Sequence, residues 1–299
     1  MPRPDFLVAT SCPCSGGVAV IEHLARHFER DLFMINVPQS RGERDVAYLA
    51  DQLRDLVAFV EAHTGEALDP ARLRAAMEAT NRARSLLIET YELAQAVPSP
   101  ARRRDLFNFG LVIALLLGTE AAVHTARVYR DEFTRKVAAG EPGVPGEQVR
   151  LMWLLTRIQF KCPVAELLER DHRAAVVVDE LNDITWAPID PDDPYPDLAR
   201  RMLSIPLGGP AARRIERLQQ LARDYRVDGV VNPCHWGCRQ GAGARGLVEQ
   251  GFKELGLPTL NLEVDCIDPR NFAPGQLTTR LEAFVETLLA RRAAKGASS

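Results

Sequence analysis

The chain has 299 residues, of which 46% are hydrophobic and 26% charged, with a net charge of −3 and an isoelectric point near 6.1. This composition is that of a globular protein long enough for one large domain or two smaller ones. The slightly acidic balance gives no basic surface for nucleic acid, and the most apolar run, residues 111–117, is far short of the ~20 residues of a membrane-spanning helix. We therefore expect neither nucleic acid nor a membrane as partner.

The six cysteines point to a reducing compartment. The N-terminal residues 1–5 lack the charged and apolar regions of a signal peptide, and without an export signal cysteines are normally free thiols rather than disulfides. We expect a cytoplasmic protein with reduced cysteines.

The N-terminal segment predicts a β-strand, an α-helix and a second, parallel strand. Residues 6–10 and 32–37 are short apolar runs typical of buried strands, and apolar residues recur at helical spacing over 18–28. In such a unit the functional loop follows the first strand, which is where Cys12 and Cys14 lie.

The middle of the chain predicts helix throughout residues 43–159, with amphipathic stripes in two long helices and two more helices after Pro98. The Pro- and Gly-rich residues 142–146 form a break, after which a helix is predicted over 147–158. This block is expected to be a helical domain.

Strands and helices alternate again in the last part of the chain. The predicted strands cover 174–178, 227–231 and 259–264, and the predicted helices cover 211–225, 247–255 and 277–291. The loop with Cys234 and Cys238 again follows a strand directly.

We therefore predict an α/β fold with two parallel-sheet lobes of Rossmann or flavodoxin type and a helical domain between them. The expected domains are residues 1–42, 43–160 and 161–299.

The two cysteine pairs are candidate metal ligands, because thiolates bind soft or borderline metals and must converge from loops. Neither pair is a C-x-x-C, so the spacing of zinc ribbons and thioredoxins is absent. The simpler alternative is that these are small buried residues near turns, and this alternative is preferred for Cys162 and Cys266. His235 is equally compatible with a fifth ligand, a proton donor, or no role.

Residues 241–246 match the G-x-G-x-x-G pattern of dinucleotide-binding loops, and Asp265 lies about 20 residues on, where a ribose-binding acid is expected. The first glycine does not follow the strand directly, so a helix N-terminus beside the cysteine loop is the preferred interpretation. Such a terminus can accept an anionic group, for instance a phosphate of coenzyme A. Asp179 and Glu180 suit either acid/base work or helix capping, and capping is the more common role.

Several segments together resemble one known family. These are residues 227–231, 237–239, 256–265 and 275–286, preceded by Asn36-Val-Pro38, the helical middle and Val177-Val-Asp-Glu180. Their order and residue types are similar to those of the 2-hydroxyacyl-CoA dehydratase and benzoyl-CoA reductase family, and the stretch 275–286 is the most specific. The resemblance implies an iron–sulfur cluster held between two α/β lobes.

By this resemblance Cys14 and Cys238 match cluster ligands, most simply of a [4Fe–4S] cluster. A further cysteine that the family draws from an upstream segment has no counterpart, because the chain begins too late. Cys12 or Cys234 is the expected substitute. A partner subunit, a truncated or degenerate chain, and a double-cubane cluster are the alternatives.

The resemblance also implies the activity. An ATP-hydrolysing activator passes one electron to the cluster, and the enzyme, a lyase, removes water from an (R)-2-hydroxyacyl-CoA or, in the related reductases, reduces an aromatic acyl-CoA. The expected partners are a second homologous subunit or a second copy, the activator and the acyl-CoA. Arg239, Gly241 and Gly243 would contact the coenzyme A phosphates, and His235 would handle a proton.

Two other functions remain open. A non-catalytic metal-binding subunit that serves as a scaffold or relays electrons would bind zinc or a cluster at the same cysteines. A nucleotide-binding α/β protein would use residues 241–246 without a metal.

Overall fold

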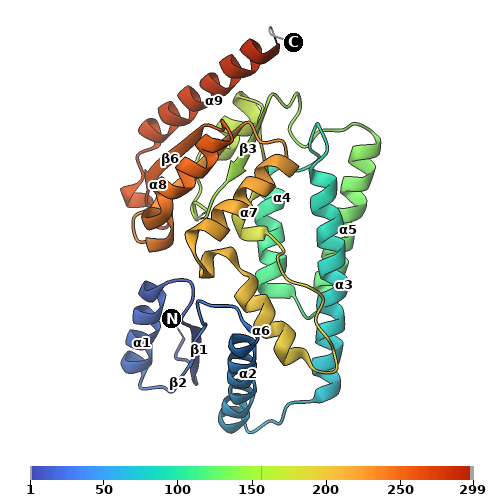
Figure 1. The fold of residues 1–299 in the computed structure, drawn as a ribbon, viewed down its shortest axis with the longest axis vertical. Helices are drawn as coiled ribbons and strands as arrows, with labels where there is room; N and C mark the ends of the chain where they lie inside the picture. The colour runs from blue at the N-terminus through green and yellow to red at the C-terminus, as the bar shows by residue number, and fades with distance from the viewer. Residues whose placement is uncertain (1, 156, 297–299) are drawn as a thin grey trace. The chain divides into compact units, whose positions relative to one another are not determined.

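A computed structural model describes residues 2–155 and 157–296, which form an α/β protein with parallel sheets (Figure 1). The strands are Leu7–Thr10 (β1), Leu32–Ile35 (β2), Val149–Trp153 (β3), Ala174–Asp179 (β4), Gly229–His235 (β5) and Thr259–Val264 (β6). The α-helices are Ser15–Phe28 (α1), Glu43–Thr64 (α2), Pro70–Ala94 (α3), Arg103–Leu111 (α4), Glu120–Ala138 (α5), Pro194–Ser204 (α6), Ala211–Asp224 (α7), Arg239–Glu254 (α8) and Pro274–Gly296 (α9). Short π- or 3₁₀-helical segments cover Val112–Leu116, Glu166–Asp171, Glu180–Asn182, Pro206–Gly208 and Pro269–Asn271. None of the helices in these described ranges is long and apolar enough to cross a membrane.

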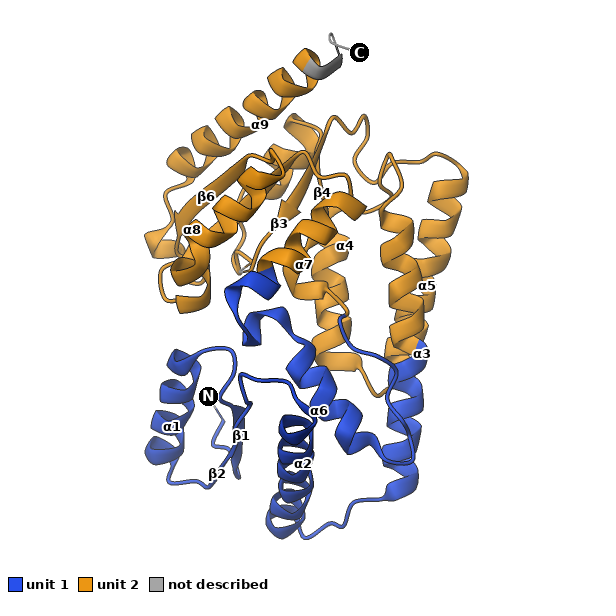
Figure 2. Ribbon diagram, viewed as in Figure 1, with its two compact units in different colours: residues 1–82, 185–214 blue, residues 83–184, 215–299 orange. Residues whose placement is uncertain are grey.

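The chain divides into two compact units (Figure 2). Unit 1 comprises Met1–Arg82 and Thr185–Arg214, and unit 2 comprises Ala83–Ile184 and Ile215–Ser299. The three domain ranges expected from the sequence stay a prediction.

Unit 1 contains the strand–helix–strand unit that the sequence predicts. Strands β1 and β2 pair in parallel from Leu7 opposite Leu32 to Thr10 opposite Ile35, and α1 connects them. The core of the unit forms where α2 and α6 pack together, with Ile35, Val46, Leu49, Ala50, Ala199 and Leu203 buried.

Unit 2 contains a four-stranded parallel sheet in the order β4-β3-β5-β6. Strands β4 and β6 and helices α7 and α9 lie where the sequence predicts them, to within a few residues. Because all four strands are parallel, their carboxyl ends meet at one edge, which is where side chains for binding and catalysis usually emerge.

The helix predicted over residues 147–158 is wrong, because Val149–Trp153 is strand β3 at the centre of this sheet. All five of its residues are buried, and it pairs with β4 on one side and β5 on the other. Even Arg150 is only 3% exposed, and its guanidinium pairs with Glu147 at 2.7 Å. An apolar run as short as this fits a helix or a buried strand, and here two neighbouring strands provide the backbone partners.

Candidate functional site

Cys14 begins helix α1 in unit 1. It is the residue that caps the helix N-terminus, and its carbonyl oxygen accepts hydrogen bonds from the backbone N–H groups of Gly17 at 3.1 Å and Val18 at 3.4 Å. A Cβ atom on Gly16 would lie 3.3 Å from the Cys14 sulfur, so glycine leaves the thiol room above the first turn. The thiol is partly exposed at a helix end that favours negative charge.

Cys12 is packed more tightly than Cys14. Its sulfur lies against Gly208, where an added Cβ would come within 2.7 Å, and its carbonyl accepts the Thr10 hydroxyl hydrogen at 2.6 Å. Burial raises the pKa of the Cys12 thiol, an effect that the nearby Arg41 guanidinium opposes. Cys12 is therefore less readily a thiolate than a free cysteine.

Cys238 occupies in unit 2 the place that Cys14 has in unit 1. It caps the N-terminus of helix α8, and its sulfur accepts a hydrogen bond from the Gly241 N–H at 3.4 Å. Its own N–H donates to the His235 carbonyl at 2.9 Å, which closes the turn between β5 and α8. The structure thus brings together Cys238, His235 and Gly241, three of the predicted site residues.

The sequence predicted that Cys234 lies in the loop after the strand. Cys234 lies instead within β5, because this strand continues to His235. Pairing with β6 holds the longer strand in place. Cys234 is 3% exposed, and its thiol points to the Asn232 carbonyl and the Asn261 side chain. Burial raises the pKa of the Cys234 thiol, partly offset by Arg245.

His235 is oriented by the loop that follows β6. Its Nδ1 accepts the backbone N–H of Cys266 at 3.2 Å and lies 3.6 Å from a carboxylate oxygen of Asp265. A neutral His235 therefore carries its proton on Nε2. The pKa of Asp265 falls to about 2 because its carboxylate accepts hydrogen bonds from the backbone of Asp268, the Asn271 side chain and the backbone of Ile267.

The sequence did not identify this role of Asp265. The carboxylate accepts two backbone N–H groups at 2.9 and 3.0 Å and so holds the turn after β6. An aspartate directly after a strand and before the turn Cys-Ile-Asp-Pro is a typical sequence signal for such a cap.

Arg239, Gly241 and Gly243 lie within the first turns of α8, which starts eight residues before the predicted helix at 247. A Cβ on Gly241 would lie 3.1 Å from Leu155, so this glycine allows close packing against the segment after β3. A Cβ on Gly243 would meet nothing within 4 Å. The expected contact of these residues with coenzyme A phosphates stays a prediction.

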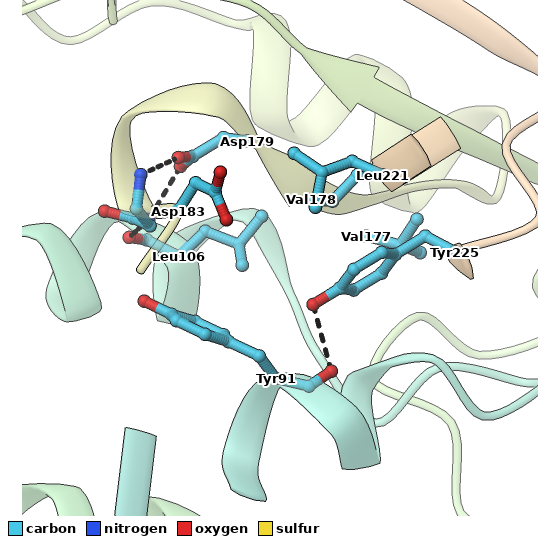
Figure 3. Close-up of a pocket in the computed structure, with 9 residues that line it drawn as sticks. Tyr91, Leu106, Val177, Val178, Asp179, Asp183, Leu221 and Tyr225 are labelled. Atoms are coloured by element: carbon cyan, nitrogen blue, oxygen red, sulfur yellow. Dashed lines mark hydrogen bonds between the residues drawn. The ribbon is translucent and has the colours of Figure 1, made fainter. Parts of the chain in front are cut away.

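Asp179, at the carboxyl end of β4, works as a cap. Its carboxylate accepts the Asn182 N–H at 2.9 Å and pairs with Arg157 at 2.7 Å. Burial raises the pKa of Asp179, and the Arg157 charge opposes that shift. Beside it lies a small pocket lined also by Tyr91, Asp183 and Tyr225 (Figure 3).

The donor chemistry fits an iron–sulfur cluster best at Cys14 and Cys238. Both thiols are partly exposed at helix N-termini, which suits a thiolate that binds iron. Within the residues that the structure describes, no three His, Cys, Asp or Glu side chains form a group that would hold a metal ion. Cys14 belongs to unit 1 and Cys238 to unit 2.

The fold and the two loops define an α/β protein with parallel sheets and a cysteine at the start of the helix that follows a strand. Over residues 2–288 the chain matches the 2-hydroxyglutaryl-CoA dehydratase D-component family, and it belongs to this family.

Curated relatives carry related names. The chain is 26% identical to the alpha subunit of (R)-2-hydroxyglutaryl-CoA dehydratase from Acidaminococcus fermentans, over 99% of this chain and 63% of that protein. It is 25% identical to the lactoyl-CoA dehydratase alpha subunit of Anaerotignum propionicum, over 98% of this chain and 71% of the relative. It is also 25% identical to a benzoyl-CoA reductase subunit of Thauera aromatica, over 98% and 72%. The chain thus spans 63–72% of the length of these relatives.

Proposed function

We propose that this chain is a subunit of an iron–sulfur enzyme that removes water from an (R)-2-hydroxyacyl-CoA. The observation that carries the proposal is the family match over residues 2–288, within which Cys14 and Cys238 stand at equivalent helix N-termini. Relatives named as dehydratase alpha subunits support the dehydratase reaction, and the relative named as a benzoyl-CoA reductase keeps aromatic acyl-CoA reduction as the alternative.

In this proposal Cys14 and Cys238 supply thiolates to a [4Fe–4S] cluster located between two Rossmann-like lobes, with Cys12 and Cys234 as the further candidates from the sequence. When bound, the cluster supplies one electron at low potential to the acyl-CoA thioester. The hydrogen bond from Gly241 N–H to the Cys238 sulfur stabilises that thiolate.

The remaining residues would position the substrate. The Nε2–H of His235 is available as a hydrogen-bond donor, because Nδ1 accepts the Cys266 N–H. The N-terminus of α8, with Arg239, Gly241 and Gly243, is suited to a coenzyme A phosphate because its backbone N–H groups and helix dipole favour anions. The proposed partners are a second homologous subunit or copy and an ATP-dependent activator, in the cytoplasm.

The test is to purify the protein without oxygen and to measure iron and acid-labile sulfide per chain. About four irons and four sulfides, with absorption near ~400 nm, are expected. Activity is then assayed with acyl-CoA substrates, ATP and an activator from a related system.

Zinc without sulfide would favour a metal-binding scaffold instead. A cluster without dehydration or ring reduction, even with the activator and a second subunit, would favour an electron-relay role. A protein without metal that binds NAD tightly would contradict the proposal and favour the nucleotide-binding alternative.

A further inference from the structure

Unit 2 has a pocket at the amino ends of strands β3 and β4, where Val149 lies opposite Ala174. Cys238 follows the carboxyl end of β5, so the pocket lies at the other edge of the same parallel sheet. The pocket has a volume of about 570 Å³ and is lined by residues 143–146, Arg102, Glu169, Arg170 and Arg173. Small-molecule sites in proteins usually have volumes of about 300–1,000 Å³.

The lining of this pocket is positively charged, with three arginines and one glutamate. The Glu169 carboxylate already accepts the backbone N–H of Arg103 at 2.6 Å, at the start of helix α4. Arg170 pairs with Asp171 at 2.8 Å, but both side chains are exposed, and such surface pairs are weak. An excess of positive charge therefore faces the pocket.

Arg173 is the arginine most available to a ligand. Among the residues that the structure describes, its side chain makes neither a hydrogen bond nor an ion pair. Its Cδ and Nη1 atoms would each lie 3.3 Å from a Cβ on Gly146, so glycine leaves room for this side chain beside the loop. The backbone of Arg173 has a φ of 52°, a left-handed conformation that residues other than glycine adopt at a cost.

The loop that forms the opposite wall of the pocket is held in place without a ligand. The Gly143 N–H donates to the Ser99 carbonyl at 2.7 Å, and the Arg102 Nε–H donates to the Gly143 carbonyl at 2.6 Å. A Cβ on Gly143 would overlap the Ala101 carbonyl, so the loop packs closely on the segment before α4. A wall that is already ordered lowers the entropic cost of binding.

We propose that this pocket binds a phosphorylated small molecule whose phosphate groups face Arg102, Arg170 and Arg173. One guanidinium satisfies both oxygens of a carboxylate, whereas phosphate and pyrophosphate groups have enough oxygens to pair with several arginines. Pro145 gives the remainder of the molecule an apolar contact. The site needs no metal and lies at the edge of the sheet away from Cys238, so it goes beyond the proposed function.

The experiment titrates the full-length protein with ADP at low ionic strength and measures the heat of binding. Arg173→Gln and Arg102→Gln remove one charge each from the pocket. Arg127→Gln is the matched control, because it removes the same charge from an exposed position on α5 outside the pocket. Circular dichroism checks the fold, and Arg173→Gln is expected to keep it because the Arg173 side chain has no hydrogen bond to lose within the described part of the chain.

Wild type and Arg127→Gln are expected to bind ADP with a Kd below ~1 mM, and the two pocket variants at least about tenfold more weakly. Pyrophosphate is expected to compete with ADP, and adenosine, which has no phosphate, is expected not to bind.

Three results would overturn the proposal. The first is that wild type does not bind ADP at ~1 mM, and the second is that Arg173→Gln or adenosine binds as tightly as wild type binds ADP. The third is a loss of binding in Arg239→Gln but not in Arg173→Gln, which would place the ADP at the N-terminus of α8. None of these readouts uses iron, so this proposal and the proposed function are tested separately.

Discussion

Tyr91 and Tyr225 line the pocket beside Asp179, and their hydroxyl groups differ in hydrogen bonding (Figure 3). The Tyr225 hydroxyl donates to the Tyr91 carbonyl at 3.0 Å, whereas the Tyr91 hydroxyl is buried without a hydrogen-bond partner among the described residues. Burial and the charges of Asp179 and Asp183 both raise the pKa of Tyr91. Its hydroxyl therefore stays protonated at neutral pH.

Tyr91→Phe is expected to leave the free energy of unfolding unchanged or to raise it by up to about 1 kcal/mol, because no protein hydrogen bond is lost. Tyr225→Phe, the matched variant, is expected to lower it by about 1 kcal/mol. Urea unfolding followed by circular dichroism measures both. An equal loss in the two variants would show instead that an ordered water binds the Tyr91 hydroxyl, for which the pocket of about 20 Å³ has room.

Asp265 gives the turn after β6 a defined dependence on pH. Its pKa in the folded protein, about 2, lies below the ordinary value of 3.8, so the ionised form stabilises the fold. This stabilisation is fully present above pH 4 and is lost as the pH falls from about 4 to about 2. Unfolding free energies of wild type and Asp265→Asn, measured across that range, are expected to converge towards low pH. A difference that does not depend on pH would contradict this prediction.

At the scale of elements, helix α8 contains glycines in two different environments. A Cβ on Gly251 would overlap the Ile215 side chain of α7, whereas one on Gly246 would meet nothing within 4 Å. Only the first of these two glycines is therefore required for packing.

Gly251→Ala is expected to lower the free energy of unfolding by about 1–3 kcal/mol because the new methyl group overpacks the contact with α7. Gly246→Ala is the control and is expected to raise it by about 0.5–1 kcal/mol through its higher helix propensity. Chemical denaturation of both variants is the measurement. A stabilising Gly251→Ala would show that α7 and α8 separate easily.

The elements also show where sequence patterns are sufficient. Helix α1 and strands β1 and β6 were predicted from the sequence alone. Their apolar residues recur at the spacing of a helix or a strand, and turn residues bound each segment. Strand β3 was missed, since it carries helix-favouring Leu and Met together with a buried Arg150.

At the scale of the whole molecule, the two proposed ligands Cys14 and Cys238 belong to different units. If they bind one shared cluster, Cys14→Ala and Cys238→Ala are each expected to remove as much iron as the double variant, because the site is lost with either thiolate. Iron per chain in the two single variants and the double variant is the measurement. Two partial losses that add up in the double variant would reveal two independent metal sites.

The sequence by itself determined the α/β class and the family. Its candidate ligands, Cys12, Cys14, Cys234 and Cys238, stay a prediction. These features depend on local patterns, namely apolar periodicity, turn residues and short motifs. Only the tertiary structure decided that residues 149–153 form the central strand, that Cys234 lies in β5, and that the segment after β3 packs against the loop after β6 and the first turn of α8. Each of these depends on pairing between strands far apart in the chain, because a strand needs hydrogen-bond partners that its own sequence does not contain.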